Sequence, residues 1–300
     1  MPIELNGVAP LPHLGVLRVQ GADAIPFLQG QLTNDFALLP DDQARLAAYC
    51  SAKGRMLASF IGFKRSADEI LLVCSRDLLP AMQKRLAMFV LRAKVKITDA
   101  TGDFALHGLA DAAVPQPGAP WTRVASSEAD IVHLYPAAGV PRALDVRPVA
   151  APAPVGEAMT TAAWLWGEVQ SGVATLSAPV VEAFVPQMLN YESVGGVNFK
   201  KGCYPGQEIV ARSQFRGTIK RRAFVAHADA PMAAGQEVFD AADPEQPVGL
   251  VAQAAEAPEG GNDAIVSLQL AAQGADLRVG TADGAVLRLQ PLPYRLLEDI

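Results

Sequence analysis

The sequence predicts an α+β fold with antiparallel sheets, a few helices and a small β-barrel at the C-terminal end. Between residues 45 and 110, apolar strand-like runs alternate with one stripe of helical spacing, which is typical of an antiparallel sheet with a helix packed on it. After Arg216, short strand-like runs are separated by turns that contain Gly, Asp or Pro, and no apolar stripe of helical length follows. Regularly spaced short strands without helices indicate a small antiparallel barrel.

The elements follow in order along the chain. Alternating aliphatic residues predict the strands, and apolar residues at helical spacing, with Asp23 near one helix start and Gly172 after another helix, predict the helices. Helices are expected at residues 21–31, 76–91, 157–171 and 206–213. Strands are expected at residues 14–19, 45–50, 55–63, 69–74, 94–97, 103–109, 122–125, 131–135, 143–146, 197–199, 221–227, 236–239, 248–253, 264–270 and 285–289.

Composition limits the protein's class. The chain has 300 residues, 50% of them hydrophobic, which suffices for a large core and two or three domains. Its net charge of −6 argues against a broadly basic, nucleic-acid-coating surface. The N-terminus lacks a charged region followed by an apolar one, and no run of 18 apolar residues occurs, so we expect a cytoplasmic protein. The three cysteines are far apart and form no CxxC pair, which fits a reducing compartment and offers no metal-site spacing.

The stretch from Asn198 to Glu208 concentrates reactive groups. Two lysines, a thiol, a phenol and a Gln-Glu pair lie close together, interrupted by two glycines and a proline. Gly202 permits a positive φ and Pro205 suits a turn or a first helical turn. Cys203 is then expected near free amides at a helix N-terminus and beside two ammonium groups, which both favour the thiolate. A surface turn with an incidental cysteine is the alternative, but the whole cluster favours a functional thiol.

Two further features are open to more than one interpretation. Trp164 and Trp166 are two residues apart in the predicted helix 157–171, so they do not share a face. Indole rings suit stacking with a flat heteroaromatic ligand such as a pterin, although on the residues alone both are expected in the core. Four basic residues follow the cysteine stretch and fit a solvated surface or a weak nucleic-acid contact; they are Arg212, Arg216, Lys220 and Arg221.

The cysteine stretch also carries a resemblance to a known family. Lys201-Gly-Cys-Tyr-Pro-Gly-Gln-Glu208, continued by Phe215-Arg-Gly217 and Lys220-Arg221, resembles the signature of the YgfZ family. These folate-binding proteins are related in fold to the aminomethyltransferase (T-protein) of the glycine cleavage system. Weaker similarity extends from about Leu14 to Tyr294. The resemblance implies a T-protein-like fold, tetrahydrofolate or a related folate as ligand, and no metal.

The resemblance also implies roles for particular residues. Cys203 would be the working thiol, tuned by Lys201, and the loop would be shaped by Tyr204, Gln207 and Glu208. Trp164 falls where the family has a folate-contacting tryptophan. Two positions depart from that site: Leu14 replaces a second such tryptophan, and Gln170 stands where related folate proteins have a glutamate.

A third departure concerns catalysis. Aminomethyltransferases have an Asp pair after the glycine of the early hairpin, and the corresponding positions here are Leu57 and Ala58. Neither side chain can act as a general base, so aminomethyl transfer is not expected.

Three hypotheses follow. The first is a folate-binding accessory protein that supports iron–sulfur enzymes, including enzymes that thiolate tRNA, as partners. The second is a tetrahydrofolate-dependent one-carbon transferase, and the third is a protein-interaction module with a vestigial folate cavity. The expected domains are a folate-fold domain of residues 1–44 and 148–215, an inserted ferredoxin-like α+β domain of residues 45–147, and a C-terminal barrel of residues 216–300.

Overall fold

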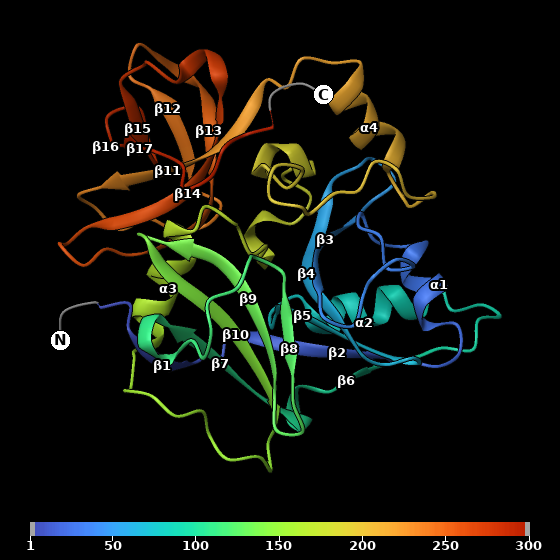
Figure 1. Ribbon diagram of the computed structural model, residues 1–300. Coiled ribbons are helices and arrows are strands. Elements are labelled where there is room, and N and C mark those ends of the chain that lie inside the picture. Colours follow the sequence, from blue (N-terminus) through green and yellow to red (C-terminus); the bar gives the residue numbers. More distant parts are fainter. Residues whose placement is uncertain (1–3, 298–300) are drawn as a thin grey trace.

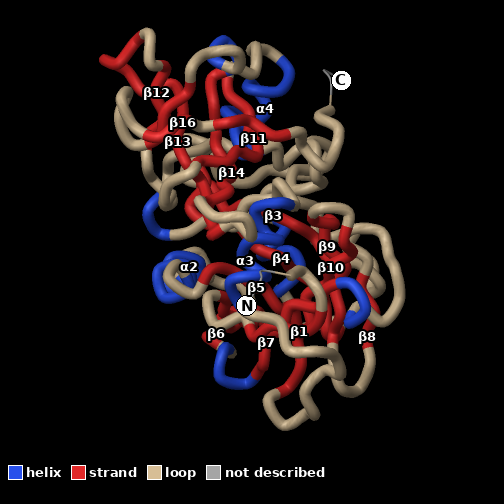
Figure 2. Tube along the Cα trace, turned by 90° about the vertical axis from the view of Figure 1, so that its left-hand side faces the viewer, coloured by secondary structure: helices blue, strands red, loops and turns tan. Residues whose placement is uncertain are grey.

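Three antiparallel sheets form most of the protein in the computed structural model, which describes residues 4–297 (Figure 1). Two sheets have five strands each and lie together, while a seven-stranded C-terminal sheet forms the other end of the molecule (Figure 2). This arrangement confirms the α+β class with antiparallel sheets and a barrel-like C-terminal part. None of the helices within residues 4–297 is long and apolar enough to cross a membrane.

The strands and helices have the following order and bounds. The first sheet runs β3 (Ala44–Cys50), β4 (Met56–Ser66), β5 (Glu69–Ser75), β2 (Leu14–Gln20), β6 (Lys96–Asp99). The second sheet runs β1 (Gly7–Pro10), β7 (Phe104–Ala110), β10 (Val140–Pro148), β9 (Asp130–Ala137), β8 (Arg123–Ala125). The C-terminal sheet runs β16 (Ala285–Val286), β15 (Leu277–Val279), β12 (Glu237–Asp240), β13 (Asp243–Glu256), β14 (Asn262–Gln269), β11 (Arg221–Ala228), β17 (Arg288–Gln290). The α-helices are α1 (Ala24–Gln29), α2 (Leu79–Ala87), α3 (Thr161–Gln170) and α4 (Gln207–Phe215), and the 3-10 turns are η1 (Thr101–Asp103), η2 (Asp111–Ala113), η3 (Ala178–Val180), η4 (Pro186–Leu189) and η5 (Leu270–Ala272).

The first sheet is covered on both faces, and strand β5 shows why. Side chains alternate between the two faces of a strand. Ile70, Leu72 and Cys74 belong to the core that the sheet shares with α1 and α2. Leu71 and Val73 belong to the core that it shares with the second sheet. A strand buried on both faces is continuously apolar, as this one is.

Helix α3 lies between the five-stranded sheets and the C-terminal sheet, and it contacts β9, β13 and β14 (Figure 1). The hydroxyl of Thr160 accepts a hydrogen bond from the backbone N–H of Ala163 at 3.1 Å and caps the helix. The helix therefore begins at Thr161, four residues later than the sequence predicts, because the chain before Thr160 has no comparable cap.

The strand expected at residues 197–199 is absent. Asn198 Oδ1 accepts hydrogen bonds from the backbone N–H groups of Lys200 (2.8 Å) and Lys201 (3.1 Å), which turns the chain. The backbone N–H of Asn198 bonds instead to the carbonyl of Thr33. An Asn side chain that binds its own neighbouring backbone competes with strand pairing, so this segment is a loop.

The two N-terminal strands join sheets whose other strands come from later in the chain. Strand β2 pairs with β5 and β6, and β1 pairs with β7. The division into residues 1–44 with 148–215, 45–147 and 216–300 stays a prediction.

Candidate functional site

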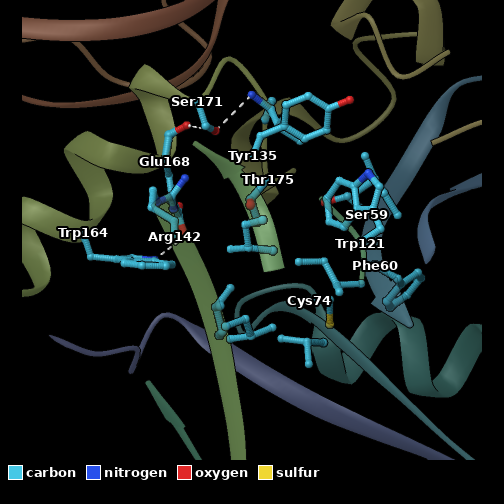
Figure 3. A pocket seen from close by; sticks show the side chains of 18 residues that line it. Ser59, Phe60, Cys74, Trp121, Tyr135, Arg142, Trp164, Glu168, Ser171 and Thr175 are labelled. Carbon is cyan, nitrogen blue, oxygen red and sulfur yellow. Dashed lines mark hydrogen bonds between the residues drawn. The ribbon is translucent and has the colours of Figure 1, made fainter. Parts of the chain in front are cut away.

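A cavity lies between the two five-stranded sheets and is closed on one side by α3 (Figure 3). Its empty volume, open mouth included, is ≈ 600 Å³. Most of the wall is apolar; of the polar groups, Arg142, Glu168 and Ser171 lie together at the α3 end, while Ser59 lies on the other side, near Trp121. The apolar lining includes Leu14, Phe60, Val73, Leu134 and Leu144, and the polar lining includes Ser59, Tyr135, Arg142, Glu168 and Ser171. An apolar cleft with a few convergent polar groups is typical of a small-molecule site.

Trp164 is fixed from two sides. It is 1% exposed, and its indole N–H donates to Glu168 Oε1 at 2.9 Å, one helical turn further along α3. On the sheet side it lies against Gly108 of β7, where an added Cβ would come within 2.2 Å of Trp164 Cε3. Only glycine lets the ring approach the backbone this closely. Trp164 is therefore held rigidly in the cavity wall.

Arg142 of β10 places its guanidinium over the Trp164 ring, 4.2 Å from the ring centroid. The side chain is buried, and burial lowers its pKa to about 10 although Glu168 acts in the opposite direction. Its Nε is buried and has no hydrogen-bond partner within residues 4–297. This Nε lies beside Gly167 of α3, while the Arg142 side chain also lines the cavity, so its guanidinium is available to an acceptor bound there.

Glu168 is the centre of the polar group. Besides Trp164, it accepts hydrogen bonds from Gln253 Nε2 of β13 (2.7 Å) and pairs with His13 Nε2 (3.2 Å). Burial acts to raise the pKa of the Glu168 carboxyl, but the bonds and charges of His13, Arg142 and Trp164 outweigh it and the pKa is lowered. Glu168 is therefore a carboxylate, and together with Arg142 it offers an acceptor and a donor at one end of an apolar cavity.

Of the other positions singled out in the sequence, some line the cavity and some do not. Leu14 lines it, whereas Gln170 faces the C-terminal sheet and donates to Asp263 Oδ2 at 2.7 Å. Leu57 and Ala58 are buried in β4 and do not reach the lining. Cys74 does line the cavity, and burial raises the pKa of its thiol to about 12, so it stays protonated.

Glu168 and Arg142 are site residues that sequence reasoning missed. For Glu168 a local signal exists, because residues four apart share a helix face. Trp164 and Glu168 form one such pair, while Trp166 and Gln170 form another, and both members of the second pair donate to Asp263 Oδ2. For Arg142 no local signal exists, since its partners come from other parts of the chain.

The cysteine loop lies outside the cavity lining. Cys203 is exposed, whereas its neighbours Lys201 and Tyr204 are each 7% exposed. Lys201 Nζ donates to the backbone carbonyls of Gln29, the last residue of α1, and Leu32, and it lies 4.9 Å from the centroid of the Tyr204 ring. Burial lowers the pKa of Lys201 to about 8, opposed by the nearby Asp35 and Cys203. Lys201 thus anchors the loop to the end of α1.

The loop is also pressed against the β3–β4 hairpin. Gly206 has a φ of 78°, and a Cβ there would come within 2.4 Å of the Ser51 carbonyl oxygen and 2.6 Å of Gly54 Cα. Helix α4 begins directly afterwards, with Gln207 half-buried and Glu208 exposed in its first turn. Of the five predicted loop residues, Lys201 and Tyr204 therefore pack against each other under the loop, Cys203 is exposed, and Gln207 and Glu208 belong to the first turn of α4. Within residues 4–297, no three His, Cys, Asp or Glu side chains are grouped to hold a metal ion.

Comparison with known proteins supplies the family. No family model matches the chain. The chain is 31% identical to the "tRNA-modifying protein YgfZ" of Edwardsiella ictaluri, covering 93% of this chain and 89% of that protein. It is 30% identical to the proteins of the same name from Sodalis glossinidius (96% and 93% covered) and Yersinia enterocolitica (96% and 92%).

A solved structure supplies the fold. The aminomethyltransferase T of the glycine cleavage system from Bartonella henselae superposes with a TM-score of 0.71 at 16% identity, covering 99% of this chain and 89% of that one. The predicted T-protein-like fold is therefore confirmed. With curated relatives at this identity over nearly its whole length, the chain belongs to the YgfZ family.

Proposed function

We propose that this protein binds a folate and acts as an accessory protein in tRNA modification, supporting iron–sulfur enzymes with Cys203 as its functional thiol. Two observations support a role in tRNA modification and a folate ligand: the relatives are named tRNA-modifying proteins, and the fold is that of a folate-related aminomethyltransferase. The observation that carries the ligand proposal is the buried group of Arg142, Trp164 and Glu168 at the end of an apolar cavity.

The residues of the cavity fit a folate. A pterin is flat and carries hydrogen-bond donors and acceptors along its edge, and the cavity combines apolar walls with a buried carboxylate and a guanidinium whose Nε lacks a partner. Glu168 would accept hydrogen bonds from the ligand, and Arg142 would donate to it. Gln170, which stands where related folate proteins have a glutamate, bonds to Asp263 instead. Leu14 would contribute to the apolar wall, and Trp164 would hold the guanidinium in place. A bound tetrahydrofolate would supply a carrier of one-carbon units.

The transferase alternative is not favoured by the cavity. Glu168 is the only acidic side chain among the described residues that line it. Its pKa is lowered, and a carboxylate with a low pKa is a weak general base. The positions of the aminomethyltransferase Asp pair are Leu57 and Ala58. We therefore propose ligand binding rather than aminomethyl transfer as the function of the cavity.

Titration of tetrahydrofolate into the purified protein tests the ligand. The Arg142→Lys variant keeps the positive charge beside Glu168 but loses the planar fork that lies over Trp164. We expect saturable binding by the wild type and a loss of affinity of about tenfold or more in the variant. The matched control is Arg278→Lys on the C-terminal sheet, which should bind like the wild type. Absence of heat with the wild type would favour a vestigial cavity.

A complementation assay tests the thiol. In cells that lack their own protein of this family, the wild type should restore the activity of iron–sulfur tRNA-modifying enzymes. Cys203→Ala and Cys203→Ser should both fail, because neither has a thiol and an exposed position tolerates either side chain. Full complementation by both variants would remove the thiol from the proposal, while complementation by the serine variant alone would reduce it to a hydrogen-bonding group.

A further inference from the structure

A second depression lies beside the cysteine loop and has a different lining from the cavity. This groove has an empty volume of ≈ 1370 Å³, open solvent included, and is built from β3, the segment around Trp121, the loop before Lys201 and the end of α4. Three of its lining side chains are aromatic, Trp121, Phe199 and Phe215, and two are basic, Arg45 and Lys200. No acidic side chain of the described residues lines it.

The chain segment of residues 195–220, on one side of the groove, is mainly basic, although the chain as a whole is acidic. The chain as a whole has a net charge of −6. Between residues 195 and 220, however, the exposed charged side chains are Lys200, Glu208, Arg212, Arg216 and Lys220, four basic and one acidic. On the other wall, the charge of the buried Asp35 acts on Arg45, and the exposed Asp41 and Asp42 precede Gln43 in the chain. The positive field of residues 195–220 is complementary to a polyanion.

One of the three aromatic side chains, Phe215, is open to solvent. The Phe215 ring is 55% exposed at the last residue of α4, and it meets the half-buried Phe199 ring edge-to-face, with centroids 5.2 Å apart. The Phe199 contact supports the Phe215 ring, which keeps most of its area open to solvent. Arg212 lies three residues before Phe215, so it is on the same face of α4. On the opposite wall, Arg45 Nη1 is bonded to Gln43 Oε1 at 2.6 Å.

We propose that this groove binds unpaired nucleotides of an RNA, with a base stacked on Phe215 and flanking phosphates held by Lys200 and Arg45. Exposed aromatic rings within a positive groove are the recurring means of binding single-stranded nucleic acid, because every base has a face that stacks. A duplex keeps its bases stacked on one another and offers none to Phe215. The inference rests on the proposed role in tRNA modification and names the surface that would contact the RNA, next to Cys203.

The test uses a fluorescein-labelled, single-stranded 12-nucleotide RNA of mixed sequence and the same strand in a duplex. Anisotropy titrations of the full-length protein should show tighter binding of the single strand. Phe215→Ala should lose about tenfold or more in affinity, while Phe215→Tyr, which keeps a stacking ring, should bind like the wild type. Lys200→Gln should make the slope of log K against log salt shallower by about 0.7. The matched controls are Phe89→Ala and Lys96→Gln, which change exposed residues that do not line the groove.

Two results would overturn the proposal. One is equal binding of single strand and duplex; the other is an affinity of Phe215→Ala equal to that of Phe89→Ala. If, in addition, polyglutamate displaces the RNA at equal charge concentration, the surface binds anions in general, such as an acidic peptide. The titration needs neither a folate nor a client enzyme, so its failure leaves the complementation result standing, and failed complementation leaves RNA binding standing. Thermal unfolding of each variant shows whether a loss of binding is a loss of folding.

Discussion

In the cavity, the central polar side chain, Glu168, is itself buried and bonded to other side chains, whereas in the cysteine loop buried side chains flank an exposed thiol. Glu168 has bonds to three other residues, so a change there alters stability and binding together. In the loop, Lys201 and Tyr204 are buried, while Cys203 is exposed. In the loop, the residues that hold the structure are therefore different from the residue proposed to react. In the cavity, Glu168 has both roles. Three predictions test this difference.

The largest effect is expected from Glu168→Ala. It leaves the buried Arg142 guanidinium uncompensated and removes the acceptor of Trp164, His13 and Gln253. Each buried partner left unsatisfied costs about 1–3 kcal/mol, and several are affected at once, so we expect a loss of about 3–5 kcal/mol in the free energy of unfolding, measured by urea denaturation. The control is Glu208→Ala, an exposed carboxylate in the first turn of α4, with an expected cost of about 0.3–1 kcal/mol. Equal costs for the two variants would contradict the prediction.

An intermediate effect is expected from Lys201→Met, which leaves the carbonyls of Gln29 and Leu32 without their donor and costs about 1–3 kcal/mol. The loss of stability in Lys201→Met should depend on pH. The pKa of Lys201 is about 8 in the folded protein, against 10.5 for an unperturbed lysine.

Between these two pH values the unfolded chain binds more protons than the folded protein. Rising pH therefore favours the folded state of the wild type. The stability difference between wild type and variant should therefore widen as the pH rises above about 8. Lys200→Met, an exposed neighbour, should give a curve parallel to that of the wild type; parallel curves for Lys201→Met would count against its burial.

The smallest effect on stability is expected from Cys203→Ala, within about 0.5 kcal/mol because the side chain is exposed. Its effect on thiol reactivity should be complete. In the native protein, one thiol per chain should react rapidly with Ellman's reagent, because burial raises the pKa of both Cys50 and Cys74 to about 12. The Cys203→Ala variant should show no rapid phase, and unfolding should expose the remaining two thiols. A rapid phase of two or three thiols would contradict the prediction, because it would show that Cys50 or Cys74 is accessible in the native protein.

The sequence pattern predicts the structure correctly where residues close together in the sequence determine it. The strand containing Leu71 and Val73 and the helix containing Trp164 follow from spacing alone, and the Lys201–Glu208 stretch carries its family signature in consecutive residues. The segment at Asn198 forms a loop because a side chain binds the backbone two and three residues later, which competes with a strand of only three residues.

The polar group of the cavity could not be predicted in the same way. Arg142 is brought onto Trp164 only by the pairing of β10 with β7 and the placing of α3 on that sheet. His13 and Gln253 reach Glu168 from opposite ends of the chain. A buried charge is tolerated only when partners from distant parts of the chain come together around it. The spacing of residues in the sequence does not predict which partners these are.

Trp121 belongs to the walls of both the cavity and the groove beside the cysteine loop. Its backbone has a φ of 69°, a left-handed conformation that is rare for a bulky residue, and its indole N–H donates to the Val194 carbonyl at 2.8 Å. A ligand in the cavity that shifts the Trp121 ring also changes the wall of the groove, and a ligand in the groove changes the wall of the cavity in the same way. The coupling is then reciprocal, since each ligand alters the affinity of the other by the same factor. The same indole is also a fluorophore, so its emission would report the occupancy of either space.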